Sequence, residues 1–191
     1  MKIILASKSP RRKELLSLIT KEFEVIVSSS DEVVDKNLAP VEQVKEIAKQ
    51  KAEDVFSRVS GDCVVIGSDT IVVSAENEIL GKPKDLEDAK RMLNILSDDM
   101  HQVMTGLTVI IRDGEKVHKH VCVDIAEVHI LPLDEYDIQK WLDTGNAWDK
   151  AGAYAVQQEF GVHIDEINGN YNTVIGLPIH RLYPIIKKYI K

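Results

Sequence analysis

The sequence at residues 63–73 is CVVIGSDTIVV. Apart from Ser68, Asp69 and Thr70, this stretch is apolar on both of its faces. A near-continuous apolar run of this length is typical of a central strand that is covered on both sides. We therefore predict a buried strand in the middle of a sheet, with a short polar interruption that contains an acid.

The segments on either side of this run predict a mixed α/β chain, with alternating strands and helices first and long strands later. Asp113-Gly114 predicts a hairpin between two long strands, and Asn168-Gly169 predicts a second hairpin over residues 162–175. We expect one domain over residues 1–191, in which an elongated mixed sheet carries helices on its faces and a deep cleft lies between two lobes. The other expected strands are residues 3–6, 23–28, 102–112 and 116–130, and the expected helices are residues 10–19, 41–59, 85–96, 133–144 and 182–190.

The composition excludes several classes of protein. The chain has 191 residues, of which 44% are hydrophobic, so it can bury a core. Its net charge of −7 argues against a nucleic-acid polymer as a partner but not against a small anion. No apolar run approaches the roughly 18 residues of a membrane span, and residues 3–6 are too short for the core of a signal peptide. With two isolated cysteines, Cys63 and Cys122, these features predict a reduced, cytoplasmic protein.

A basic segment, Ser7-Lys8-Ser9-Pro10-Arg11-Arg12-Lys13, lies between a short buried strand and the start of a helix. A helix N-terminus carries partial positive charge, so four cations at this end are unfavourable by themselves. An anion bound by the serine hydroxyls, the backbone N–H groups and the arginines would offset that cost. A solvated basic turn is the alternative.

Asp69, Lys51 and Lys82 are polar residues in unexpected places. An ionised carboxylate in a buried strand is costly unless a partner or a metal compensates it. Lys51 points along the apolar stripe of its helix, and Pro83 biases Lys82 toward an extended conformation. A structural salt bridge would account for Asp69 without any catalytic role, and snorkelling would account for Lys51.

Residues 149–157, DKAGAYAVQ, are rich in small side chains and have no clear period. This composition suits a loop packed under a ligand, although an ordinary surface connection would look the same. Taken together, the basic segment, the two lysines, the carboxylate and this loop suit a polyphosphate with a divalent metal.

Five motifs resemble those of the Maf family of nucleoside triphosphate pyrophosphatases, in the family's order and near its spacing. The resemblance implies an ITPase-like α/β fold and hydrolysis of a nucleoside triphosphate to the monophosphate and pyrophosphate, with Mg²⁺ or Mn²⁺ as the divalent cation. The motifs are SKSPRR at residues 7–12, GSDT at 67–70, GKP at 81–83, DKAGAY at 149–154 and GLP at 176–178.

The same resemblance implies a role for each site residue. Asp69 would accept a proton from the attacking water, and Lys51 and Lys82 would hold phosphates and stabilise developing charge. Glu32 and Asp69 would lie next to the metal. The residues expected to bind the substrate are Ser7, Ser9, Arg11, Arg12, Thr70 and Gln157.

Thr70 resembles the dTTP/UTP branch of the family. The amide of Gln157 offers the donor and the acceptor that a pyrimidine-dione edge requires. The chain has Ser68, Ala155 and Gln158 where that branch usually has alanine, glycine and glycine. A 7-methyl-GTP pyrophosphatase, a nucleotide-binding regulator of cell division and a nucleic-acid binder remain alternatives, and strand edges left by long hairpins are compatible with a homodimer.

Overall fold

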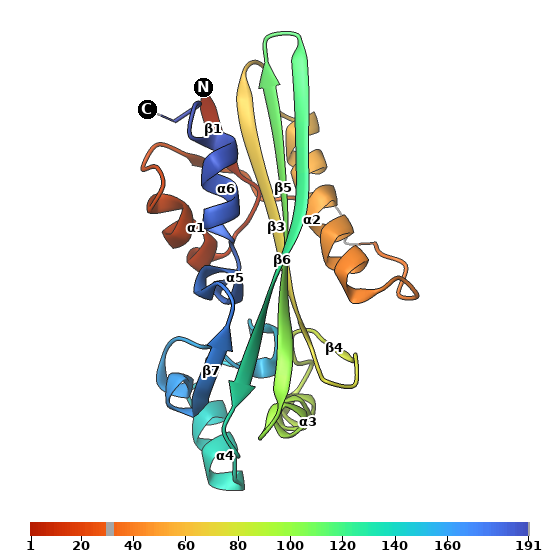
Figure 1. Ribbon diagram of the computed structural model, residues 1–191, viewed down its shortest axis with the longest axis vertical. Helices are drawn as coiled ribbons and strands as arrows, with labels where there is room; N and C mark the ends of the chain where they lie inside the picture. The colour runs from red at the N-terminus through yellow and green to blue at the C-terminus, as the bar shows by residue number, and fades with distance from the viewer. Residues whose placement is uncertain (30–32, 191) are drawn as a thin grey trace. The chain divides into compact units, whose positions relative to one another are not determined.

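The computed structural model describes residues 1–29 and 33–190. The described strands form one seven-stranded sheet in the order β2-β1-β3-β5-β6-β7, with β4 paired to β3 (Figure 1). They are β1 (Lys2–Leu5), β2 (Glu24–Val25), β3 (Cys63–Val73), β4 (Ile79–Leu80), β5 (Met100–Asp113), β6 (Lys116–Ile130) and β7 (Ile164–Asn168).

The helices alternate with strands in the first half of the chain and gather again at its end. None of the helices in the described residues is long and apolar enough to cross a membrane. They are α1 (Pro10–Ser17), α2 (Pro40–Ser57), α3 (Leu86–Leu96), α4 (Glu135–Asp143), α5 (Tyr171–Ile175) and α6 (Ile179–Ile186), with 3₁₀ helices η1 (Ala151–Ala153) and η2 (Glu159–His163).

The apolar run at residues 63–73 forms β3, as predicted. β1 pairs with it in parallel from Lys2↔Cys63 to Leu5↔Ile66, and β1 also pairs in parallel with β2. Nine of the eleven β3 residues are buried, and the other two are Asp69 and Thr70. The prediction of a mixed α/β sheet is therefore confirmed, since β4 and β7 pair antiparallel with their neighbours.

The first predicted hairpin is present, and the second is wrong. β5 and β6 are joined at Gly114-Glu115, where Gly114 has a φ of 58°. Residues 162–175 instead form η2, then β7, then α5. β7 pairs with β6 rather than with the residues after Gly169, and the Asn170 side chain accepts a bond from the Asn172 backbone at the start of α5. A local turn signal was thus overruled by a partner strand about 40 residues away in the sequence.

The chain divides into two compact units. Unit 1 comprises residues 1–69, 105–124 and 176–191, and unit 2 comprises residues 70–104 and 125–175. β3, β5 and β6 each contribute one part to each unit. One apolar cluster of unit 1 joins β1, β3, β5 and α2. The core of unit 2 joins α3, α4 and residues 153–160 around Trp141 and Phe160, whose ring centroids lie 5.3 Å apart.

In unit 1, α2 lies directly on the sheet. A Cβ atom placed on Gly67 of β3 would lie 2.5 Å from the Ala48 carbonyl oxygen, and one on Gly106 of β5 would lie 2.5 Å from that of Val44. The missing side chains let the helix backbone approach the strands closely. Figure 1 shows α1 and α6 on the other side of these strands from α2.

Candidate active site

The start of α1 forms a compact polar turn in unit 1. The backbone N–H of Ser9 donates to Ser7 Oγ at 3.2 Å, and that of Arg12 donates to Ser9 Oγ at 3.5 Å. Ser9 is thus the N-cap and Pro10 occupies the first turn, as the sequence predicted. The turn follows β1 at its carboxyl end, where ligands bind in α/β folds.

The side chain of Arg12 is held back against this turn. Its Nε donates to the carbonyl oxygen of Gly176 at 2.8 Å, and its Nη1 donates to Ser7 Oγ at 3.3 Å. Two bonds from one planar guanidinium fix its orientation. Arg11, the other arginine of the motif, lies in the same helical turn and is partly exposed.

Lys51 and Asp69 form an ion pair in unit 1. Lys51 Nζ donates to Asp69 Oδ1 at 2.7 Å, and each side chain is only 14% exposed. Asp69 is two residues beyond Gly67, so both face α2, and Lys51 lies one helical turn from the Ala48 contact. For Asp69 the sequence left two alternatives, a structural salt bridge and a functional role. The salt bridge exists, and it joins Asp69 to Lys51, which is itself a predicted site residue.

Asp69 lies between the part of β3 that pairs with β1 and the part that pairs with β4. The pairing of β1 ends at Ile66, and that of β4 begins at Val72. Between these positions neither short strand covers β3. Lys51 Nζ contacts Oδ1 of Asp69, and 14% of the Asp69 side chain is exposed.

Ser68 lies on the opposite face of β3 from Asp69 and contacts two backbone carbonyl groups there. Its side chain is fully buried, and its Oγ lies 2.9 Å from the Gly106 carbonyl oxygen and 3.1 Å from that of Gly176. The Gly176 oxygen is therefore shared by Ser68 and Arg12. Sequence reasoning missed this contact, although Gly176 belongs to the GLP motif.

Three other predicted site residues, Thr70, Lys82 and Gln157, belong to unit 2. There the GKP and DKAGAY motifs meet, because the Gly152 backbone N–H donates to the Gly81 carbonyl oxygen at 3.0 Å. Pro83 is buried while Lys82 is exposed, and Gln157 is half-buried. Glu32 lies outside the described residues.

The DKAGAY motif is held from within unit 2. Lys150 is buried and donates to Asp149 Oδ1 at 2.7 Å and to the Asn146 carbonyl oxygen. The Tyr154 hydroxyl lies 2.7 Å from His101 Nε2, and burial raises the pKa of Tyr154 and lowers the pKa of His101 to about 4. Neither the Lys150 anchor nor the role of His101 was foreseen from the sequence.

Gln158, next to Gln157, has φ 69° and ψ −160°. This region of backbone space is adopted almost only by glycine and costs on the order of 1–3 kcal/mol for other residues. Gln158 is one of the two residues, with Ala155, that stand where the dTTP/UTP branch named above usually has glycine. The backbone beside Gln157 therefore has a conformation typical of glycine, although a glutamine occupies the position.

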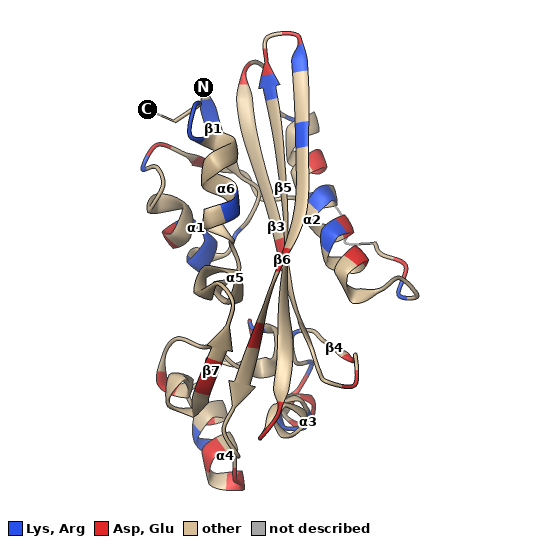
Figure 2. Cartoon of the chain, in the orientation of Figure 1, with Lys and Arg blue, Asp and Glu red and all other residues tan. Residues whose placement is uncertain are grey.

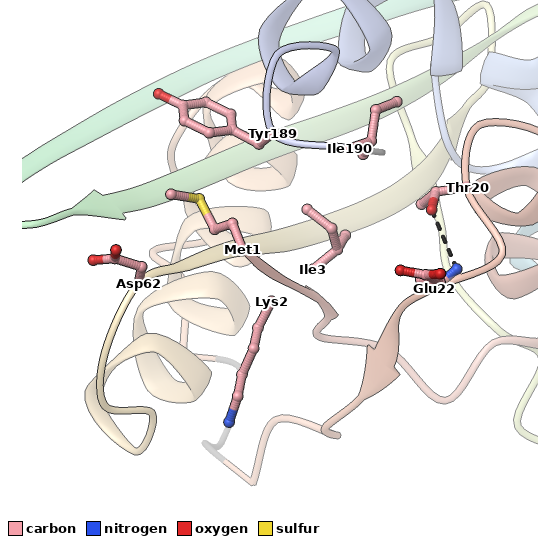
Figure 3. A pocket seen from close by; sticks show the side chains of 8 residues that line it. All are labelled: Met1, Lys2, Ile3, Thr20, Glu22, Asp62, Tyr189 and Ile190. Atoms are coloured by element: carbon pink, nitrogen blue, oxygen red, sulfur yellow. Dashed lines mark hydrogen bonds between the residues drawn. The ribbon is translucent and has the colours of Figure 1, made fainter.

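A pocket of about 390 Å³ lies elsewhere in unit 1 and contains none of the predicted site residues (Figure 3). It is lined by Met1, Lys2, Ile3, Thr20, Glu22, Asp62, Tyr189 and Ile190. Most of these belong to the amino end of β1, the loop after α1 and the C-terminal segment. The predicted site residues of unit 1 instead follow the carboxyl end of β1.

The donors at Asp69 fit a divalent cation carried mainly by substrate phosphates. No cluster of three metal-binding side chains occurs in residues 1–29 and 33–190. Mg²⁺ does not need one, because it is commonly bound by one or two carboxylates, water and phosphate oxygens. Asp69 offers one such carboxylate.

Comparison with known proteins identifies relatives over nearly the whole chain. The family model described as Maf-like protein matches residues 2–189. A dTTP/UTP pyrophosphatase of Lachnoclostridium phytofermentans is 45% identical over 98% of this chain and 94% of its own length. One of Alkaliphilus metalliredigens is 42% identical over 98% and 96%.

Solved structures confirm the fold. The Ham1 protein of Staphylococcus aureus has a TM-score of 0.53 at 16% identity, covering 99% of this chain and 100% of that one. The HAM1 protein of Coxiella burnetii has the same TM-score at 12% identity, covering 98% and 99%.

Proposed function

The chain belongs to the Maf family, and from that premise we propose that it hydrolyses nucleoside triphosphates, dTTP and UTP first among them, to the monophosphate and pyrophosphate. The observation that carries the proposal is the Lys51–Asp69 ion pair in the unit that also holds the Ser7–Arg12 turn. A carboxylate with an adjacent cation, and an arginine oriented at a helix start, are suited to phosphoryl chemistry. Two relatives that are dTTP/UTP pyrophosphatases support the same reaction.

In this reaction Asp69 takes a proton from a water molecule as the water oxygen attacks the α-phosphorus. The bond between the α-phosphorus and the oxygen that bridges to the β-phosphorus breaks, and pyrophosphate leaves with that oxygen. Lys51 orients the carboxylate through Oδ1, which directs Oδ2 to the water. Arg12 stabilises the charge that develops on the phosphate oxygens.

The other predicted residues bind the substrate in this proposal. Ser7, Ser9 and Arg11 bind the triphosphate, and Lys82 is a phosphate-binding cation. Thr70 and Gln157 select the base. Buried polar groups matched to a base edge reject analogues that leave them unpaired.

We propose that Asp69 and Glu32, with the substrate phosphates, hold the Mg²⁺ or Mn²⁺ ion. Such an ion neutralises phosphate charge as the leaving group departs. In the cell the enzyme would remove surplus or modified pyrimidine nucleotides in the cytoplasm.

A nucleotide panel tests the proposal. Purified protein is incubated with dTTP, UTP, dCTP, GTP and 7-methyl-GTP in Mg²⁺ or Mn²⁺, and pyrophosphate is measured. We expect dTTP and UTP to turn over fastest. Preference for 7-methyl-GTP would show that the proposed base specificity is wrong. Absence of pyrophosphate with every triphosphate would refute the proposed reaction.

Asp69→Asn should lower kcat by at least about 100-fold, because it removes the general base while keeping the size of the side chain. Asp165→Asn is the control, since Asp165 is paired with His129 and belongs to none of the motifs that carry the predicted site. Unchanged turnover in Asp69→Asn would refute the assigned role. Full rescue of a deletion strain by this inactive variant would favour a regulatory function instead.

A further inference from the structure

We propose that Ser68 is a positioning residue that sets the orientation of Arg12 through the carbonyl group of Gly176, and thereby sets the affinity for the triphosphate. The inference deepens the proposed function and rests on the phosphate-binding role given there to Arg12. It concerns a residue that neither the motif roles nor the comparisons assign.

Arg12 and Ser68 share one hydrogen-bond acceptor. The Gly176 carbonyl oxygen accepts from Arg12 Nε at 2.8 Å and lies 3.1 Å from Ser68 Oγ. A carbonyl oxygen has two lone pairs, so it can accept both bonds at once. Arg12 and Ser68 are therefore linked through one atom, although they are 56 residues apart in the sequence.

Ser68 is buried, which limits the partners of its hydroxyl group. Its hydroxyl is fully buried and can donate its single hydrogen either to Gly176 or to Gly106, whose carbonyl oxygen is 2.9 Å away. Ser68→Ala removes the hydroxyl that helps to set the direction of the Gly176 carbonyl, which then depends on Arg12 alone. The guanidinium keeps its bond to Ser7 Oγ, but its orientation is less sharply defined.

The segment that carries Gly176 is held in place by contacts other than the one to Ser68. Gly176 has a φ of 117°, which favours glycine, and α6 begins three residues later. In the first turn of α6, Arg181 Nε donates to the buried carboxylate of Asp124 on β6 at 2.9 Å. This ion pair holds the segment against the sheet, so the loss of the Ser68 hydroxyl changes the direction of a carbonyl without releasing the segment.

The contact between Ser68 and Gly176 is separate from Asp69, the proposed general base. Ser68 and Asp69 are neighbours on β3 and point to opposite faces. The Lys51–Asp69 pair lies on the α2 side, and the Gly176 contact lies on the other. Substitution of Ser68 should therefore alter substrate binding by Arg12 far more than the chemical step.

The experiment measures dTTP kinetics and the binding of inorganic tripolyphosphate, with Mg²⁺ present, by calorimetry. Ser68→Ala should raise KM and weaken tripolyphosphate binding about three- to tenfold, the range of one neutral hydrogen bond, with kcat within about twofold. The matched control is Ser74→Ala, which also removes a buried, hydrogen-bonded serine hydroxyl near the end of β3. It should leave both quantities unchanged.

A double-mutant cycle then distinguishes positioning from packing. Arg12→Lys keeps the charge and loses the planar fork that contacts Gly176. In that background Ser68→Ala should have no further effect on tripolyphosphate binding, whereas in Lys51→Ala its effect should persist. Equal effects of Ser68→Ala in the wild-type and Arg12→Lys backgrounds would overturn the inference, as would unchanged binding in Ser68→Ala.

The same data distinguish this inference from the proposed function. A wild-type protein that binds tripolyphosphate but releases no pyrophosphate would refute the reaction, while the cycle still decides the role of Ser68. A wild-type protein that does not bind tripolyphosphate would overturn the positioning role.

Discussion

His101 is a histidine whose burial prevents it from carrying charge. Only 2% of it is exposed, its Nε2 contacts the Tyr154 hydroxyl, and its Nδ1 has no hydrogen-bond partner in the described residues. Desolvation is the largest cause of the low pKa, about 4. The imidazole is thus neutral at physiological pH and serves to hold the DKAGAY motif through Tyr154.

This pKa predicts an acid sensitivity. Between pH 6.5 and 4 the unfolded chain binds a proton at His101 that the folded chain does not, so stability is lost as pH falls through this window. The full loss is about 3 kcal/mol by pH 4. Urea unfolding at several pH values should show a smaller acid loss in His101→Gln, with the exposed His118→Gln as the control. Parallel pH curves for His101→Gln and the wild type would contradict the prediction.

At the scale of elements, the position of Lys51 depends on how closely α2 approaches β3. Gly67 and Gly106 allow the contact, and the helix then presents Lys51 to Asp69. The helix itself follows from the apolar stripe at residues 44–55. Its distance from the sheet follows from two glycines, one of them only two residues before Asp69.

Gly67→Ala should therefore disturb both stability and the ion pair. The new Cβ would lie 2.5 Å from the Ala48 carbonyl oxygen and 2.8 Å from the Ala52 Cβ, so α2 must move outward. We expect a loss of about 1–3 kcal/mol in the free energy of unfolding, and reduced turnover because Lys51 moves with the helix. Gly81→Ala, with open space around its Cβ, is the stability control. Equal stability of the two variants would show that the helix tolerates the extra atom.

At the scale of the whole molecule, charge is divided unevenly between the two units. Unit 1 carries 18 Lys+Arg against 15 Asp+Glu, whereas unit 2 carries 6 against 16. Acidic residues gather on α4 and β7, as Figure 2 shows. Unit 2 therefore has a net charge of −10, whereas unit 1, which holds Arg12 and Lys51, has a net charge of +3. A net positive unit favours a polyanionic substrate.

The two units should nevertheless unfold together, because β3, β5 and β6 continue from one into the other. Phe160→Ala in the core of unit 2 should cost about 3–5 kcal/mol. The fluorescence of Trp141 reports unit 2, and the reactivity of the buried Cys63 thiol reports unit 1. In a Cys122→Ser background, both probes should change at the same urea concentration, and both midpoints should fall in Phe160→Ala. Separate midpoints would show two independently unfolding units.

The sequence by itself determined the elements whose signals are local, and it singled out most of the candidate site residues. The apolar run at 63–73 formed β3, Ser9 and Pro10 started α1, and Asp113-Gly114 turned the hairpin. The positions of Lys51 and Asp69 in apolar elements singled them out as candidate site residues, and the structure pairs them.

Tertiary structure alone decided the rest, because those features depend on contacts between distant residues. Asn168-Gly169 carries a hairpin signal, yet β7 pairs with β6 and a Cβ on Gly169 would meet Ala126 at 2.8 Å. The Gly176 carbonyl joins Ser68 and Arg12 across 108 and 164 residues. No periodicity or turn propensity encodes such a contact, since it exists only once the strands and helices have packed.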